Sequence, residues 1–102
     1  MALYLDEIWL NATSRESTLQ AYAAFRAVAS GGGFPPGVTL RAGPWFSNEE
    51  PKVILVLDIA DHATTFTSFT LAVASGLVAR RRLEPIVEAN AVDALLGTQP
   101  SS

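Results

Sequence analysis

The fold is decided by residues 3–10, which read LYLDEIWL. Successive side chains of a β-strand point to opposite faces of the sheet. One face of this segment would carry Leu3, Leu5, Glu7 and Trp9, and the other Tyr4, Asp6, Ile8 and Leu10. Because both faces are mainly apolar and each holds one acid, we expect a central strand that is buried on both sides.

The rest of the chain alternates between helical and strand-like patterns. Thr13 and Glu16 form a capping box, which starts a helical period over residues 15–30. Strand-like runs follow at 38–46 and 53–59, a second helical pattern covers 63–80, and the last strand covers 83–89. This order is that of the ferredoxin-like βαββαβ fold. We therefore predict an α+β domain with a four-stranded antiparallel sheet in the strand order 4-1-3-2.

Local signals refine this arrangement. Residues 53–59 are apolar on both faces except at Asp58, which indicates the second central strand. Pro85 lacks a backbone N–H, so the last strand should lie at an edge of the sheet. Glycines 31–33 would end the first helix, Asp61 would cap the second helix, and arginines 80–82 would lie at the negative end of that second helix.

Apolar stripes predict which helical side chains pack on the sheet. The stripe of the first helix comprises Leu19, Tyr22, Ala23, Phe25 and Ala29. The stripe of the second helix comprises Phe66, Phe69, Val73 and Leu77. A further stripe on the second helix, which indicates either a partner or cover by the C-terminal tail, comprises Leu71, Ala74 and Val78. A short helix over 90–96 would close a single domain of residues 1–97, and residues 98–102 would form a disordered tail.

Composition limits the classes of function. Apolar residues make up 49% and charged residues 17% of the 102-residue chain, so we expect surplus apolar surface that forms an interface. The net charge of −3 argues against nucleic-acid binding, which calls for a basic face. The absence of cysteine excludes disulfides and thiolate metal sites and fits a cytoplasmic protein. Asp6 and Glu7 interrupt any signal peptide, and the longest charge-free run, 63–79, is shorter than a membrane span.

Short motifs along the chain add a family resemblance. They are Phe25-Arg26, Pro36-Gly37-Val38, Gly43-Pro44-Trp45, Asp58 with Asp61 nearby, and Pro85-Ile86-Val87. With these motifs the chain resembles the dimeric α/β barrel superfamily and, within it, a small uncharacterised family. The resemblance implies a homodimer whose two ferredoxin-like sheets pack against each other. That family often carries a tryptophan in the second helix, where this chain has Phe66 and Phe69.

The superfamily includes cofactor-free monooxygenases, isomerases and haem-linked enzymes. Chemistry of these kinds suggests roles for particular residues of this chain. Asp58, Asp6 and His62 are the candidate catalytic bases, because a carboxylate in an apolar cavity and an imidazole can both exchange protons near neutral pH. Arg41 could bind a carboxylate or phosphate. Tyr4, Trp9, Trp45 and Phe46 could stack on a flat substrate.

Each of these residues also has a structural interpretation. His62 could be a solvated residue of the first helical turn rather than a base or a haem ligand. The strand acids could pair with Arg26 or Arg41, and the aromatic residues could fill the core. No second histidine or cysteine supports a metal site, and we expect no cofactor.

The function predicted from the sequence is therefore the binding of a small apolar or aromatic molecule in a sheet-lined cavity. Any chemistry would be cofactor-free and monooxygenase-like or isomerase-like. In the monooxygenase version, the base removes a substrate proton to give a carbanion that reacts with oxygen. The alternative is a non-catalytic homodimeric binding or assembly module. We expect neither nucleic acid nor membrane among the partners.

Overall fold

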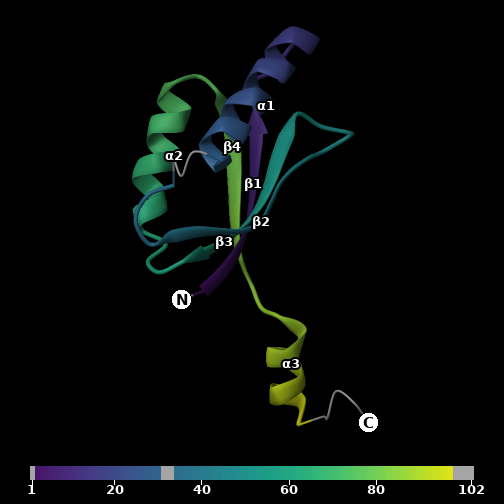
Figure 1. Ribbon diagram of the computed structural model, residues 1–102, viewed down its shortest axis with the longest axis vertical. Helices are drawn as coiled ribbons and strands as arrows, with labels where there is room; N and C mark the ends of the chain where they lie inside the picture. The colour runs from purple at the N-terminus through teal and green to yellow at the C-terminus, as the bar shows by residue number, and fades with distance from the viewer. Residues whose placement is uncertain (1, 31–33, 98–102) are drawn as a thin grey trace.

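The computed structural model describes residues 2–30 and 34–97, and it has an α+β fold with one four-stranded antiparallel sheet (Figure 1). The elements in chain order are β1 (Ala2–Leu10), α1 (Arg15–Ser30), β2 (Val38–Phe46), β3 (Lys52–Ile59), α2 (Thr64–Ala74), β4 (Val78–Ile86) and α3 (Ala89–Leu96). The predicted class and the four-stranded antiparallel sheet are confirmed. The predicted helix end at glycines 31–33 and the predicted tail at 98–102 lie outside the described residues.

The strands lie side by side in the order β2-β3-β1-β4. β1 and β3 are central, as their two apolar faces predict, and β4 with its Pro85 lies at an edge. β1 pairs with β3 in a register that sets Leu5 opposite Val56 and Ile8 opposite Val53. The acids of β1 therefore lie in the middle of the sheet.

The two faces of the sheet have different surroundings. Helices α1 and α2 cover one face (Figure 1), and the buried core beneath them comprises Ile8, Leu10, Ala21, Val53, Leu55, Leu57, Ile59 and Val78. We call the opposite side the open face. Alternation along the two central strands assigns to it Leu3, Leu5, Glu7 and Trp9 of β1 and Lys52, Ile54, Val56 and Asp58 of β3.

The second helix is shorter than its sequence pattern predicted. α2 ends at Ala74 rather than at residue 80, because Gly76 adopts a left-handed φ of 83° that terminates the helix. Arginines 80–82 consequently lie in β4, which begins at Val78 instead of residue 83. The predicted contact of these arginines with the negative end of the helix is therefore wrong.

The helices also present different faces to the sheet from those predicted. Phe66 and Val73, expected in the core, are 68% and 43% exposed. Thr65 is buried instead, one residue and about 100° around the helix axis from Phe66. On α1, Leu19 is 49% exposed while Ala21 is buried. Residue type alone therefore did not determine the inward direction, since the buried residues of the two helices are the small Ala21 and the hydroxyl-bearing Thr65.

The helix starts differ from the predicted caps. The Ser17 N–H donates to Ser14 Oγ at 3.1 Å, so Ser14, and not Thr13, caps α1. Asp61 accepts from the Ala63 N–H at 3.1 Å and stabilises the turn before α2, which itself begins at Thr64.

The C-terminal helix α3 extends beyond the sheet. It follows β4 after the two residues Val87 and Glu88, and Figure 1 shows it projecting from the end of the sheet, away from α1 and α2. None of its residues is buried. The longest dimension of the molecule is consequently 51 Å, against 29 and 22 Å for the other two. Within residues 2–30 and 34–97, no helix is long and apolar enough to cross a membrane.

Candidate ligand-binding site

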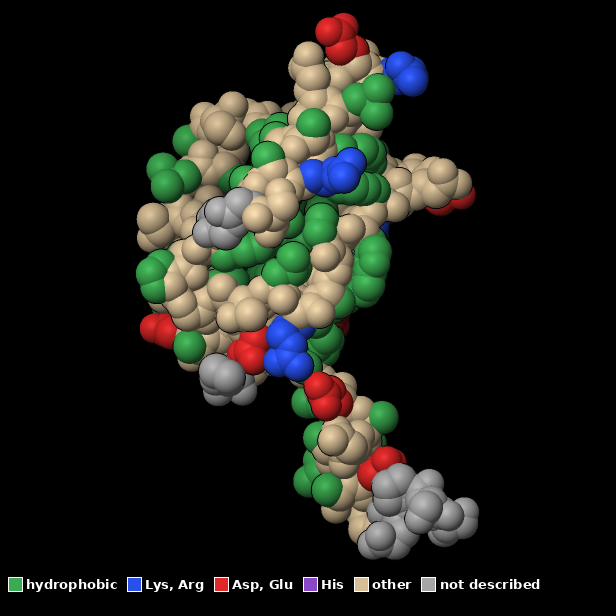
Figure 2. All heavy atoms as spheres, in the orientation of Figure 1, with side chains coloured by type: hydrophobic (Ala, Val, Ile, Leu, Met, Phe, Trp, Pro, Cys, Tyr) green, Lys and Arg blue, Asp and Glu red, His purple; other side chains and the backbone are tan. Residues whose placement is uncertain are grey.

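A cavity of about 230 Å³ lies between the two covering helices and the sheet. Its walls are mainly apolar and include Phe25 and Val28 of α1, Phe69 and Ala72 of α2, and Leu55 and Leu57 of β3. Figure 2 shows hydrophobic side chains gathered in the hollow between α1 and α2. The cavity exists because small residues face inward from both helices, as at Ala29 and Ala72.

An ion pair between Asp6 and Arg81 lies in this apolar surrounding. Arg81 donates from Nε to Asp6 Oδ1 and from Nη2 to Asp6 Oδ2, both at 2.7 Å. This two-bond geometry is the strongest form of an arginine–carboxylate pair. Asp6 is only 1% exposed. The register of β1 with β4 explains the contact, since Arg81 lies opposite Ile8, two residues along the strand from Asp6.

Burial raises the pKa of the Asp6 carboxyl above its ordinary value, and the hydrogen bonds and charge of Arg81 only partly oppose this effect. The water-poor surrounding disfavours the charged carboxylate, so Asp6 holds a proton more readily than an exposed aspartate does. A carboxyl group of this kind can act as a general acid or base.

Arg81 keeps donor capacity for a ligand. Its third hydrogen bond runs from Nη1 to the Thr65 carbonyl oxygen at 3.4 Å. A guanidinium has five N–H groups, so two of them have no acceptor among the described residues. The Thr65 hydroxyl already donates to the His62 carbonyl at 2.7 Å. Arg81 is thus the side chain suited to bind an oxygen acceptor in the cavity.

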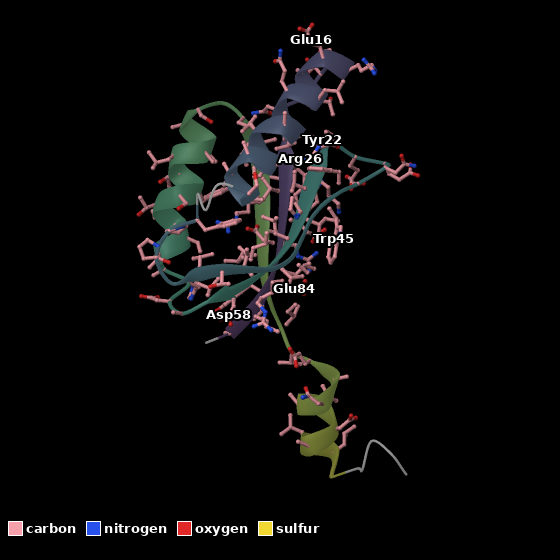
Figure 3. The ribbon with its side chains drawn as sticks, viewed as in Figure 1. Glu16, Tyr22, Arg26, Trp45, Asp58 and Glu84 are labelled. Atoms are coloured by element: carbon pink, nitrogen blue, oxygen red, sulfur yellow. The ribbon has the colours of Figure 1, made fainter. Side chains whose placement is uncertain are left out.

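The residues predicted as one site are divided between the two faces of the sheet. Asp6 lies in the cavity on the helix-covered side. Tyr4 and His62 lie on that same side, with ring centroids 6.0 Å apart, but neither lines the cavity, and His62 is exposed. Asp58, which Figure 3 labels, lies on the open face, and Arg41 contacts it there. Within one chain, Asp58 and Asp6 therefore cannot contact the same small molecule.

On the open face, the predicted residues mostly contact one another or nearby charges. Arg41 Nη1 lies 3.4 Å from Asp58 Oδ2, as the salt-bridge interpretation predicts. The Trp9 ring lies between two cations, with Lys52 Nζ at 4.8 Å and the Arg80 guanidinium at 3.9 Å from its centroid. These cations stabilise Trp9 in place.

The other predicted aromatic residues have separate surroundings. Trp45 lies on edge strand β2 and is 55% exposed. Phe46 packs against Tyr22 of α1, with ring centroids 4.4 Å apart, as the core-filling interpretation predicts.

Sequence reasoning missed Arg81, the partner of the most buried acid. It placed the three arginines on a helix, where they would share no face with a strand acid. Alternation in a strand gives a different result, since residue 81 shares a face with Leu83 while residues 80 and 82 point the other way. The strand alternation that places Arg81 on the helix-covered face is therefore present in the sequence. It can be recognised only if Ser75–Gly76 is taken as the end of the helix.

In the part of the chain that the structure describes, no group of three or more histidine, aspartate or glutamate side chains is placed to hold a metal ion. Comparison of the chain with protein families, with curated proteins and with solved structures finds no match. Any functional conclusion consequently rests on the geometry alone.

Proposed function

We propose that the protein binds a small, mainly apolar organic molecule with one oxygen acceptor group in the cavity between the helices and the sheet. The observation that carries this proposal is the enclosure of the Asp6–Arg81 pair within apolar walls. Ligand sites in proteins combine such walls with a few convergent polar groups and with titratable groups of shifted pKa.

The volume of the cavity favours a small ligand. Pockets for drug-sized molecules hold roughly 300–1,000 Å³, and an engineered apolar cavity of about 150 Å³ binds benzene. The present cavity of about 230 Å³ lies between these two sizes. A single ring with one short substituent would match it.

The charge of the pair favours a neutral ligand. Asp6 already balances Arg81, so a buried anion would bring a second negative charge near the carboxylate, which is costly in an apolar site. A ketone or phenol oxygen can instead accept one of the unused Arg81 N–H groups. With a ketone, Asp6 would take a proton from the carbon next to the carbonyl and return it to the carbonyl oxygen, which gives the enol, while Arg81 stabilises the intervening enolate oxygen. That is cofactor-free isomerisation.

The test is a ¹H–¹⁵N NMR titration with acetophenone and phenol as probes. We expect saturable shifts in amides of β1, α2 and β4 that line the cavity. Ser68 lies at the exposed side of the cavity wall, so Ser68→Phe should obstruct entry and abolish the shifts. Thr67→Phe is the matched control, because Thr67 is the exposed neighbour that does not line the cavity. If neither probe shifts these amides, or if both variants bind alike, the proposed site is wrong.

We also propose that the domain is ferredoxin-like and forms a homodimer of the dimeric α/β barrel type, with the open faces of two chains turned toward each other. The strand order β2-β3-β1-β4 and the one-sided helix cover support this assignment. The aliphatic centre of the open face (Leu3, Leu5, Ile54 and Val56) supports it further, since a sheet face of this kind needs a cover. A native mass spectrum that shows only monomer over micromolar concentrations would contradict it.

A further inference from the structure

The cavity between the helices and the sheet encloses one negative and one positive side chain. Among the described residues that line it, only Asp6 and Arg81 can carry a charge. Tyr4 and His62 lie on the same side of the sheet but outside this lining, and α2 has no titratable residue. The lining residues of α1 and β3 are apolar. Because an arginine stays protonated, any change of charge inside the cavity has to occur at Asp6.

The ion pair leaves donors for a third group. Arg81 donates twice to the Asp6 carboxylate and once to the Thr65 carbonyl oxygen, which leaves two N–H groups for a ligand oxygen. An anion on these groups would share one guanidinium with the Asp6 carboxylate. Two negative groups that share an apolar site disfavour each other's charge, and one of them then keeps a proton.

Asp6 is suited to keep this proton. A protonated carboxyl group donates one O–H and still accepts hydrogen bonds. It can therefore accept from Arg81 through one oxygen and donate to an anion through the other. Burial already raises the pKa of Asp6, and a negative charge beside it raises the pKa further. Entry of an anion thus draws a proton from solvent onto Asp6.

We propose that the cavity also binds small organic anions with an apolar body, such as aromatic carboxylates and sulfonates, and that Asp6 takes up a proton as each anion binds Arg81. This inference rests on the ligand-binding cavity proposed above and extends its ligands from neutral molecules to anions. The added proton cancels the added negative charge, so the net charge inside the cavity does not change. The enolate of the proposed isomerisation has the same distribution, with the proton on Asp6 and the negative oxygen at Arg81.

Proton uptake makes the affinity for an anion depend on pH. Above the folded pKa of Asp6, each anion has to bind together with a proton, so its affinity falls by about tenfold for each unit of pH. A neutral ketone adds no charge beside Asp6 and draws no proton. The pH dependence therefore distinguishes the two kinds of ligand.

The test compares benzenesulfonate with acetophenone. Benzenesulfonate is ionised at every pH used, so it cannot bring the proton itself. Isothermal titration calorimetry at pH 7, in two sulfonate-free buffers of different ionisation enthalpy, counts the protons taken up, and we expect about one per benzenesulfonate and about none per acetophenone. From pH 6 to pH 8, the dissociation constant should rise by at least about tenfold for benzenesulfonate and change by less than about twofold for acetophenone.

Two variants of neighbouring residues locate the proton. Asp6→Asn removes the carboxyl, and its amide can donate to the anion instead. Benzenesulfonate should then bind without proton uptake and with less than about a twofold change over the same pH range. Glu7→Gln is the matched control, because Glu7 follows Asp6 in β1 but lies on the open face, and it should keep the wild-type pH dependence. The calorimetry on the wild type gives a result even if Asp6→Asn does not fold.

A third variant locates the anion. Ser68→Phe at the cavity wall should abolish binding of both probes. Benzenesulfonate that still binds this variant occupies the exposed arginines instead of the cavity, which would contradict the inference.

The outcomes separate this inference from the proposed function. If acetophenone binds but benzenesulfonate does not, or binds without proton uptake, the inference is wrong and the proposed function stands. If only benzenesulfonate binds, with proton uptake, the inference stands and the neutral ligand is wrong. If neither probe binds, both are wrong.

Discussion

Asp6 and Glu7 are consecutive residues of β1, and yet they lie on opposite faces of the sheet. Asp6 is enclosed beneath the helices and binds Arg81 through two hydrogen bonds. Glu7 lies on the open face and accepts one hydrogen bond from Lys52 Nζ at 2.8 Å. Their side chains are 2% and 16% exposed, respectively. Two consecutive carboxylates of one strand thus lie in different environments, one beneath the helices and one on the open face.

The comparison shows that distance alone does not determine what an ion pair contributes. A fully buried pair loses the hydration of both charges, whereas a partly buried pair such as Glu7–Lys52 keeps part of its hydration. The hydrogen bond that Lys52 donates to Glu7 raises the pKa of Lys52, and burial raises the pKa of Asp6. The raised pKa of Lys52 records an attractive contact, and that of Asp6 records the cost of desolvation.

The largest difference between the faces should appear when one carboxylate is neutralised. Asp6→Asn leaves the Arg81 charge in the cavity wall without its counter-ion. We expect a loss of about 3–5 kcal/mol in the free energy of unfolding, the usual cost of breaking a buried pair. Urea denaturation followed by circular dichroism measures it.

Glu7→Gln is the matched control for this change. Lys52 retains a second acid, Glu50, at 3.6 Å, and the pair is on the open face. We expect a loss of at most about 1 kcal/mol. Equal losses in the two variants would remove the distinction between the faces.

The second largest effect concerns function rather than stability. Asp6→Leu combined with Arg81→Met replaces the buried pair by apolar side chains of similar volume. Such replacements are often neutral or stabilising, so the free energy of unfolding should exceed that of Asp6→Asn by about 3 kcal/mol or more. Acetophenone and phenol should nevertheless no longer shift the cavity amides. Retained binding in this double variant would show that the cavity selects ligands by shape alone.

Much of the fold could be predicted from the sequence, because the apolar patterns of β1 and β3 agree with the central positions that tertiary packing gives these strands. Two apolar faces can be satisfied only in the centre of a sheet, and Pro85 can be tolerated only at an edge. The residues 15–30 and 38–46 were assigned the same bounds that α1 and β2 have. In these segments local propensity and tertiary packing favour the same state.

The candidate site was harder to predict from the sequence, because its ion pair joins residues 75 positions apart. The sequence could not specify which of Asp6 and Glu7 faces the helices, since both faces of β1 are apolar. That choice follows from the register with β4, and the start of β4 was obscured by a helical pattern that continues past Ala74. A single glycine therefore determined whether Arg81 could be recognised as the partner of Asp6.

A smaller effect is expected in the pH dependence of stability. The pKa of Asp6 is raised in the fold above its ordinary value of 3.8, so the folded state binds this proton more tightly than the unfolded chain. The contribution of Asp6 is therefore fully present below pH 3.8 and is lost as the pH rises through the folded pKa. Urea denaturation between pH 3 and 8 measures the decline.

The variant with Asp6→Leu and Arg81→Met serves as the reference for this pH series. It lacks the titrating carboxyl, so the difference between wild type and variant isolates Asp6 from the other acids. A difference that is flat with pH, or that grows in favour of the wild type as the pH rises, would contradict a raised pKa for this group.

The smallest effect is expected at the second ion pair of the open face. Arg41 is 52% exposed at its side chain and contacts Asp58 through one bond of 3.4 Å. Such a pair contributes about 0–1 kcal/mol and is screened by salt, so Arg41→Gln should change stability by less than about 1 kcal/mol at 0.15 M salt. Urea denaturation at low and high salt checks this value. A loss near that of Asp6→Asn would mean that the open face is as dry as the helix-covered face in solution, which only a covering partner could produce.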